Sequence, residues 1–325
     1  MTELNKSKKP SVFAKMWQKM NNDTMPKTLQ KGKYKLIISF TLLQVIGFLV
    51  FYLGVHINSW KLAFQQINGI DSDGNDIVIY SLYNFKEFFR LLGSKDAVLP
   101  IALRNTLLYF LLNTFVLLPA PFILAYFFHK KLAGFKFFRI ALYLPAIISS
   151  VAIVSMVKYI LAGNGPVAAI VYNLWGVEWS SPLDSDTMAT PTILIYCIWA
   201  GLNGNLLLFQ GAFNRVPSSV IDAAQIDGVT GAQELYRIYL PMMMPTVSTI
   251  VILNVTNIFN LSGPILLFTN GAHNTSTISF WIYDQVKVQD SYNLPSAVGI
   301  MFTLINLPII VLVRKFFKRF DDIEY

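Results

Sequence analysis

The sequence predicts an all-α integral membrane protein with six transmembrane helices, and three observations support this prediction. The 325-residue chain is 54% hydrophobic, and only 14% of its residues are charged, whereas a soluble domain usually carries about 25% charged residues. Several uncharged apolar segments are about 20 residues long, the length that a helix needs to cross the hydrocarbon core of a bilayer. Basic residues gather in alternate connecting segments, as the topology of membrane proteins requires.

Six segments have the length and the low charge of transmembrane helices. They are residues 36–55, 102–128, 140–159, 191–213, 243–269 and 294–313. The first apolar run is longer than the apolar core of a signal peptide, so we expect it to remain as an uncleaved span. The chain then divides into a basic N-terminal segment, a membrane domain with an outer loop, and a short tail. These parts comprise residues 1–35, 36–313 with the loop 56–101, and 314–325.

The basic residues lie mostly on one side of the predicted membrane domain. Nineteen of the 26 Lys and Arg residues fall in segments 1–35, 130–139, 214–242 and 314–325, whereas segment 161–190 has none. Cytoplasmic segments carry the excess of Lys and Arg, so both termini are predicted to be cytoplasmic. The net charge of +8 is therefore a signal of topology, and we expect no nucleic-acid partner.

The cytoplasmic loop between the fourth and fifth spans, residues 214–242, has the pattern of two short helices separated by a glycine. Ser219, with Asp222 three residues later, predicts a side-chain cap at the start of the first helix. Gly228 suits the left-handed position that follows the last turn of that helix. We call residues 214–242 the coupling loop.

The second helix of the coupling loop has its own start and stop signals. Thr230 and Gln233 have the spacing of a capping box. Pro241 has no backbone N–H and is expected to mark the boundary before the fifth span. A simple connector lying on the inner leaflet would show the same local pattern, so local structure does not assign a function to the loop.

The residue identities in the coupling loop resemble the EAA motif of permease subunits of ATP-binding-cassette (ABC) importers. That motif reads Glu-Ala-Ala, three residues, Gly, nine residues, Ile, one residue, Leu-Pro. The residues here that match this spacing are Asp222, Ala223, Ala224, Gly228, Ile238, Leu240 and Pro241. Asp222 replaces the family's Glu, and Val229 replaces its usual Ala. The run Ala-Ala-Gln-Ile-Asp-Gly resembles the sugar-uptake branch, the maltose-type inner-membrane subunits.

The resemblance extends over about residues 80–315. Asn84-Phe85, the stretch 102–107, Phe138-Arg139 and Leu144-Pro145 are similar to the same family. The C-terminus lacks the Gly- and Lys-containing tail of one of the two permease types. The chain therefore resembles the other type, which usually has the longer N-terminal extension.

The resemblance implies one half of a paired pore that imports a sugar or oligosaccharide. It implies three protein partners: an ATP-binding-cassette ATPase dimer, a second permease subunit and an extracytoplasmic solute-binding protein. In the family, the EAA loop docks on the ATPase and moves the spans when ATP closes the ATPase dimer. The residues implied in ATPase coupling are Asp222, Ala223, Ala224, Asp227, Gly228, Ile238, Leu240 and Pro241.

Neither catalysis nor metal binding has a motif in the sequence. There is no phosphate-binding Gly-x-x-x-x-Gly-Lys-Ser/Thr loop, so ATP hydrolysis is expected in a separate subunit and this chain is not expected to be an enzyme. His56, His129 and His273 are far apart and lack an HExxH pattern. The acidic stretch 71–75 resembles a calcium loop but lacks the required Gly and Glu. We expect no cofactor and no metal.

A secondary carrier or facilitator for a small polar solute is the alternative function. Ion-coupled carriers usually place ionisable residues in the middle of the membrane. The six predicted spans contain no Asp or Glu, which argues against ion coupling but leaves a facilitator open.

A sugar path needs amide or hydroxyl groups beside an aromatic ring. The fourth span offers Trp199, Asn203 and Asn205, and the fifth offers Asn254 and Asn257. Trp199 and Asn203 are four residues apart, and Asn254 and Asn257 are three apart, so each pair shares a helix face. The same amides could instead hold neighbouring helices together. The sequence does not specify which sugar is carried.

Overall fold

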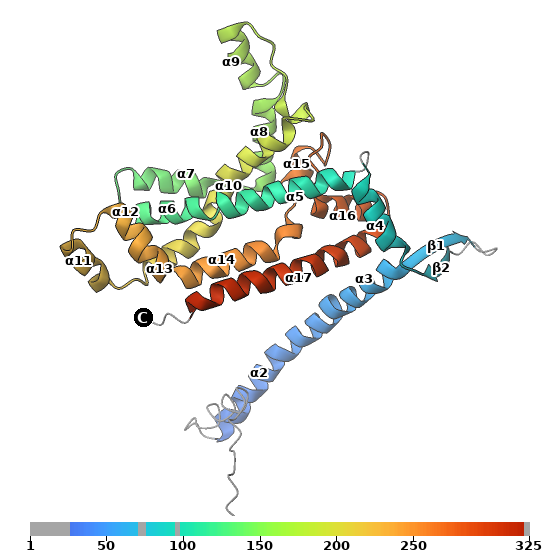
Figure 1. Cartoon of the computed structure of the whole chain (residues 1–325), viewed down its shortest axis with the longest axis horizontal. Helices are drawn as coiled ribbons and strands as arrows, with labels where there is room; N and C mark the ends of the chain where they lie inside the picture. The colour runs from blue at the N-terminus through green and yellow to red at the C-terminus, as the bar shows by residue number, and fades with distance from the viewer. Residues whose placement is uncertain (1–26, 71–75, 95–97, 322–325) are drawn as a thin grey trace, which may run out of the picture. The chain divides into compact units, whose positions relative to one another are not determined.

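The computed structural model describes residues 27–70, 76–94 and 98–321, which are mostly helical (Figure 1). The acidic stretch 71–75, considered above as a calcium loop, lies outside these residues. Two units can be distinguished, residues 1–58 and 59–325.

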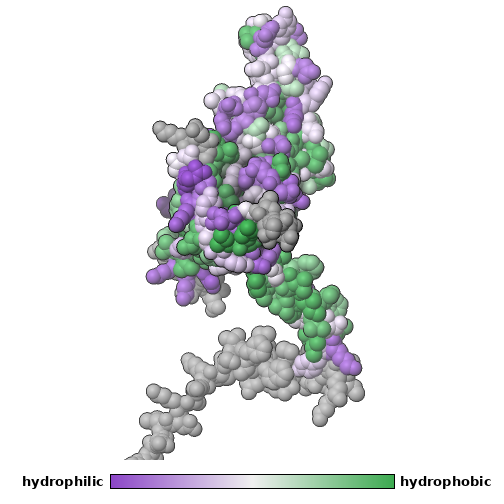
Figure 2. Space-filling model, turned by 90° about the vertical axis from the view of Figure 1, so that its right-hand side faces the viewer, coloured by the Kyte–Doolittle hydropathy of each residue, from purple (hydrophilic) through white to green (hydrophobic). Residues whose placement is uncertain are grey.

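The first unit contains an apolar helical run. It comprises α2 (Lys27–Gly47), a π-helical segment η1 (Phe48–Gly54) and the start of α3 (Val55–Phe64). Leu43 and Phe51 are 73% and 78% exposed, and Figure 2 shows hydrophobic residues over this run. A large exposed apolar surface of this kind fits contact with lipid, and the predicted span 36–55 lies within it.

The segment predicted only as the outer loop 56–101 contains ordered elements. Strands β1 (Gln65–Ile70) and β2 (Asp76–Tyr80) pair antiparallel, with Gln65 opposite Tyr80. Helix α4 (Tyr83–Gly93) follows. The buried side chain of Asn84 donates hydrogen bonds to the carbonyls of Ala63 (2.9 Å) and Gln65 (2.7 Å), which fixes α4 to the base of the hairpin.

The main bundle is formed by six longer helices of the second unit. They are α5 (Val98–Phe115), α6 (Pro119–His129), α7 (Phe135–Ile147), α10 (Ala189–Phe213), α14 (Met244–Thr256) and α17 (Asn293–Asp321). Helices α5 and α6 follow each other nearly in line, α10 packs along α6, and α14 packs along α17 (Figure 1). At the end that carries α4 and α16, polar residues predominate at the surface (Figure 2).

The third predicted span, 140–159, is wrong as one continuous helix. Helix α7 ends at Ile147, and α8 (Ser150–Leu161) begins after two residues with extended backbone, Ile148 and Ser149. Pro145 lies inside α7 and cannot donate a helix hydrogen bond, which weakens the last turn. Helix α8 leads instead towards α9 (Pro166–Trp175), which extends away from the bundle (Figure 1), and the 3₁₀ turn η2 (Pro182–Asp184) follows.

The fifth predicted span, 243–269, is too long. Helix α14 ends at Thr256, and the rest forms the 3₁₀ turn η4 (Ile258–Asn260) and the short helix α15 (Ile265–Phe268), before α16 (Ile278–Lys287). Gly263 has φ +53°, and Pro264 follows it at the N-cap of α15, so a separate short helix starts there. Hydrophobic composition alone does not reveal such a break.

Five helices among the described residues are long and apolar enough to cross a membrane. They are Tyr34–Phe64, Val98–His129, Ser150–Trp175, Ala189–Phe213 and Asn293–Lys318. A sixth candidate is the pair Gly231–Met242 and Met244–Thr256, which is bent by 72°.

Candidate functional site

The first helix of the coupling loop, α11 (Ser218–Ile226), ends as the sequence predicts. Gly228 has φ +74°, and its N–H donates to the Gln225 carbonyl at 3.1 Å. The predicted cap at Ser219 is wrong, because no side chain caps this helix and Pro217 occupies the cap position. Ser219 therefore lies inside the first turn, where its hydroxyl cannot serve as the cap.

The second half of the coupling loop forms α12 (Gly231–Gln233), the π-helical segment η3 (Glu234–Tyr239) and α13 (Leu240–Met242). The capping box is confirmed, because the side chains of Thr230 and Gln233 each accept a hydrogen bond from the other's backbone N–H. The boundary before the fifth span lies two residues later than Pro241. Pro241 lies in the first turn of α13, where its missing N–H is tolerated, and the 72° bend follows at Met243.

Helix α11 has one face packed against the protein and one face open. Ile221 and Ala224, three residues apart, are each only 8% exposed, and Ile221 packs in the main apolar core. Asp222, Ala223 and Asp227 are exposed. Of the remaining predicted coupling residues, Gly228 is exposed, and Ile238, Leu240 and Pro241 are half-buried.

An exposed isoleucine on α11 was absent from the predicted coupling residues. The Ile226 side chain is 87% exposed, although isoleucine is among the residues most often buried. No local pattern in the sequence identifies it, because the tertiary structure decides which face of α11 is covered. Ile226 makes the open face of α11 both charged and apolar.

An ion pair fixes the second half of the coupling loop to the end of α6. Lys130 Nζ contacts Glu234 Oε1 at 2.5 Å, and the two side chains are 23% and 6% exposed. Lys130 Nζ also lies 5.8 Å from the centre of the Tyr126 ring. The Tyr126 hydroxyl donates a hydrogen bond to the Gly231 carbonyl at 3.2 Å. Sequence reasoning missed all of these contacts, because they join distant parts of the chain.

Aromatic packing surrounds this junction. The Phe213 ring centre lies 4.8 Å from that of Tyr239 and 5.6 Å from that of His129, with which it stacks. His129 is therefore a packed side chain beside the coupling loop. Within the described residues, no group of three or more His, Cys, Asp or Glu side chains is arranged to hold a metal ion.

Two of the three candidate path residues on α10 bond to backbone. The Asn205 amide donates to the Leu117 carbonyl (3.0 Å), which lies between α5 and α6. The Asn203 amide donates to the Ala200 carbonyl of its own helix (3.0 Å). Trp199 is 36% exposed, with its ring 6.2 Å from that of Tyr196.

The two candidates on the fifth predicted span lie in different environments. Asn254 Nδ2 is buried and has no hydrogen-bond partner among the described residues. Asn257 is exposed at the end of α14, and its amide donates to the Leu253 carbonyl at 2.9 Å. Helices α10 and α14 pack against each other, so the structure brings together the two helices that carry the candidate path residues. The side chains of these five residues nevertheless lie in different environments.

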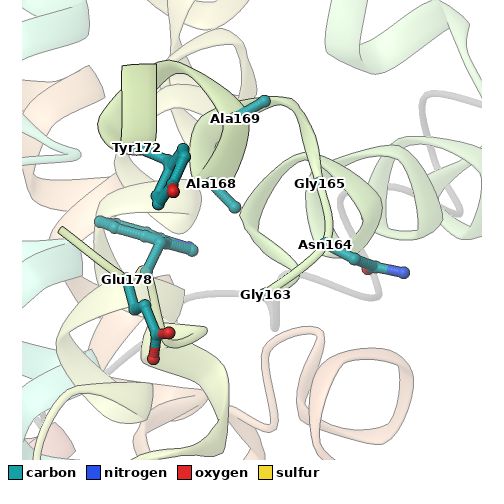
Figure 3. Close-up of a pocket in the computed structure, with 8 residues that line it drawn as sticks. Gly163, Asn164, Gly165, Ala168, Ala169, Tyr172 and Glu178 are labelled. Atoms are coloured by element: carbon teal, nitrogen blue, oxygen red, sulfur yellow. The ribbon is translucent and has the colours of Figure 1, made fainter. Parts of the chain in front are cut away.

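An open cleft lies beside α9, at the part of the chain that extends away from the bundle. Its volume is about 500 Å³, and it is lined by Gly163, Asn164, Gly165, Ala168, Ala169, Tyr172, Glu178 and Trp179. The Trp179 indole N–H donates to the Leu161 carbonyl at 3.0 Å, which fixes the ring. Figure 3 shows Tyr172 projecting from α9 on the same side as the segment that carries Glu178. The sequence alone indicated no site at these residues.

A second cleft, of about 390 Å³, lies between the start of α5, the start of α10 and the loop after α15. Its lining includes Arg104, Asp186 and Asn274. The buried side chain of Asn105 donates to the carbonyls of Asn274 (2.6 Å) and Ser276 (2.9 Å). Thr190 also donates to the Asn274 carbonyl (3.2 Å), so this loop is held by two helices.

Comparisons with known proteins agree with this architecture. A permease protein of an arabinooligosaccharide transport system, AraP of Bacillus subtilis (strain 168), is 24% identical over 283 residues, which cover 85% of this chain and 86% of AraP. The polygalacturonan/rhamnogalacturonan transport system permease protein YteP of the same organism is 22% identical over 262 residues, 75% of this chain and 82% of YteP.

A solved structure has a similar fold. It is a bacterial alginate ABC transporter in complex with an alginate pentasaccharide-bound periplasmic protein. One of its chains superposes with a TM-score of 0.74 at 23% identity, covering 95% of this chain and 99% of that chain.

The family model for the binding-protein-dependent transport system inner membrane component matches residues 103–322, which include the coupling loop and most of the main bundle. The chain therefore belongs to this family and is a permease of an ABC transporter.

Proposed function

We propose that this chain forms one half of the pore of an ABC importer for a sugar or oligosaccharide, and that a separate ATPase dimer drives it through the coupling loop. The observation that carries this proposal is the two-faced helix α11. Its Ile221 side is anchored in the bundle, and its opposite side is open. A helix held on one side transmits displacement, whereas an unanchored loop would absorb it. The names of the relatives support a sugar as the substrate.

The coupling residues divide into two groups by exposure. Asp222, Ala223, Asp227 and Gly228 are exposed and are proposed to contact the ATPase. The buried or half-buried members orient the loop, and they are Ala224, Ile238, Leu240 and Pro241. Ala224 thus acts from the inner face of α11, and the exposed Ile226 joins the contact surface.

A topology with six spans and both termini in the cytoplasm accompanies this function. Helix α14, the second part of the bent pair, would contribute the sixth span. The end of α17 lies at the same end of the bundle as α11 (Figure 1) and carries Arg314, Lys315 and Lys318. Lys and Arg at that end fit the cytoplasmic side of the cell membrane. The membrane domain 36–313 would then contain the cytoplasmic coupling loop 214–242 and the outer segment 56–101.

A second permease subunit is proposed to cover the polar surface near the end of α14. Asn257 and Asn260 are exposed in this chain. Polar side chains facing lipid are costly, so they usually face a partner helix or an aqueous path. The proposed sugar path therefore runs past Trp199, Asn203, Asn254 and Asn257, whereas the Asn205 amide is engaged in joining helices.

An extracytoplasmic solute-binding protein is proposed to dock at α9, which projects away from the bundle (Figure 1). Ile170 and Trp175 of α9 are 55% and 68% exposed beside the cleft of Tyr172 and Trp179. Exposed apolar side chains next to polar groups mark protein interaction surfaces.

The test is purification of the tagged chain with its natural partners, followed by reconstitution in liposomes with the binding protein. We expect an ATPase and a second permease to copurify, and uptake of sugar to require ATP. A chain that purifies alone and equilibrates sugars without ATP would be a facilitator and would overturn the proposal.

A further inference from the structure

We infer that Lys130 and Glu234 are positioning residues that pass movement of the coupling loop to α6. This inference rests on the proposed function, because it concerns how a motion driven by the ATPase enters the bundle. Neither residue belongs to the EAA-type motif. The two are brought together only by the fold, at the junction between the end of α6 and the start of η3.

The environment of the pair makes it a stiff link. Glu234 is 5% exposed, and its carboxylate contacts the Lys130 ammonium directly. Removing Lys130 leaves the buried Glu234 carboxylate desolvated without compensation, which is strongly unfavourable. The two ends of this link therefore stay together as the loop moves, whereas an exposed ion pair would exchange easily with water.

A second contact makes the link resistant to rotation. Tyr126 and Lys130 are four residues apart and lie on one face of α6. Their partners, Gly231 and Glu234, lie three residues apart at the start of the second half of the loop. Segment 231–234 is thus held against the last turn of α6 at two points, and we expect the two to move as one body.

The opposite end of α6 has the features of a pivot. The backbone between α5 and α6 is irregular at residues 116–118, and Pro119 starts α6. Asn205 bonds to the Leu117 carbonyl, and a Cβ atom at Gly201 would lie 2.7 Å from the Leu117 side chain. Helix α10 therefore packs closely against Leu117, in the irregular backbone between α5 and α6.

Helix α6 is therefore a short rigid helix that the coupling loop moves at one end and that rotates about its other end. Its 11 residues span about 16 Å at the usual helical rise. Displacement of the coupling loop enters at Lys130, and the change of angle is taken up at residues 116–118. The motion can then reach α5, whereas the chain itself joins the coupling loop only to α10 and α14.

The experiment uses the permease copurified with its own ATPase and partner subunit, with ATP as the probe. Spin labels are placed on α6 and α17 by Ile123→Cys and Leu312→Cys, both exposed positions, in a background with Cys197→Ser. The distance between the labels is measured with and without ATP and vanadate. In the otherwise unchanged protein, we expect ATP to shift this distance.

Four variants separate transmission from simple stabilisation. Lys130→Met and Glu234→Gln each remove one charge, and the third variant combines Lys130→Glu with Glu234→Lys to restore a pair of reversed sign. Lys131→Met is the matched control, because Lys131 is an exposed neighbour. We expect each single change at the pair to reduce the ATP-dependent shift at least threefold while ATP hydrolysis continues. The reversed pair should recover most of the shift, and the control should retain it fully.

Two results would overturn the inference. One is a normal ATP-dependent shift in Lys130→Met and Glu234→Gln. The other is a reversed-pair variant that assembles and hydrolyses ATP but does not recover the ATP-dependent shift in label distance. If the single variants fail to assemble, this second result alone tests the inference. Failure of the proposed function would look different. The permease with Lys130 and Glu234 unchanged would then copurify with no ATPase, or its label distance would not shift with ATP.

Discussion

The side-chain amide of Asn205 donates a hydrogen bond to the backbone carbonyl of Leu117, 3.0 Å away and 88 residues earlier in the chain. This bond satisfies a carbonyl at the irregular backbone between α5 and α6. A buried carbonyl that loses its partner costs about 1–3 kcal/mol, so the contact both stabilises the break and ties it to α10.

Asn205→Ala should therefore lower the stability of the detergent-solubilised protein by about 1–3 kcal/mol. The measurement is thermal unfolding followed by circular dichroism. Asn203→Ala is the matched control, because the Asn203 amide bonds to a carbonyl of its own helix that already belongs to a helical turn. Equal destabilisation by the two changes would contradict a joining role for Asn205.

Gly228→Val should uncouple ATP hydrolysis from transport while leaving membrane insertion intact. Apart from its chain neighbours, no described residue lies within 4 Å of a Cβ atom placed at Gly228, so the effect must come from the backbone at φ +74°. A β-branched residue in a left-handed conformation costs about 1–3 kcal/mol, and α11 would relieve this by turning. The check is sugar uptake and ATP hydrolysis in the same liposomes.

Gly228→Asn provides the control for that change, because Asn adopts left-handed conformations more readily than other non-glycine residues. It should retain most of the coupling. Normal transport by Gly228→Val would count against α11 as the helix that contacts the ATPase.

Ile226→Asp should weaken binding of the ATPase without destabilising the permease. Its side chain is 87% exposed, so the folded chain loses almost no packing. Burial of an apolar side chain of this size at an interface contributes about 1.5–3 kcal/mol, which corresponds to a tenfold or larger loss of affinity. The fraction of ATPase retained on the tagged permease after washing measures this effect.

Val288→Asp is a suitable comparison for Ile226→Asp. Val288 is 71% exposed directly after α16, at the other end of the bundle from α11. ATPase retention should not change. Full retention in Ile226→Asp would show that the open face of α11 does not bind the ATPase.

Asn105→Leu should loosen the loop after α15. The Asn105 side chain is fully buried and donates to two carbonyls of that loop, those of Asn274 and Ser276. Leucine keeps a similar volume but leaves the Ser276 carbonyl without this donor, at a cost of about 1–3 kcal/mol. The Asn274 carbonyl keeps the Thr190 hydroxyl as a donor. Limited proteolysis should then cut within residues 269–277 faster than in the unchanged protein.

Asn113→Leu is the control for Asn105→Leu, because Asn113 also lies on α5 but bonds only to the Tyr109 carbonyl of its own helix. It should leave the cleavage rate of the loop unchanged. Unaltered cleavage in Asn105→Leu would mean that Thr190 and the remaining contacts hold the loop alone.

The sequence by itself determined the features that depend on composition or on residues a few positions apart. The apolar helical character of the chain follows from its hydrophobic composition. The left-handed Gly228 and the capping box of Thr230 and Gln233 follow from backbone sterics and hydrogen bonds within one or two turns. The EAA-type spacing identified the family because those residues lie close together along the chain.

Only the tertiary structure decided where apolar stretches break and which faces are covered. A hydropathy profile does not reveal the interruptions after Ile147 and Thr256, because the segments on both sides of each break are apolar. The exposed Ile226 and the buried Ala224 differ by which face of α11 packs on the bundle. The ion pair of Lys130 with Glu234 joins residues that no local pattern relates, and its energy depends on burial that exists only after the helices have packed.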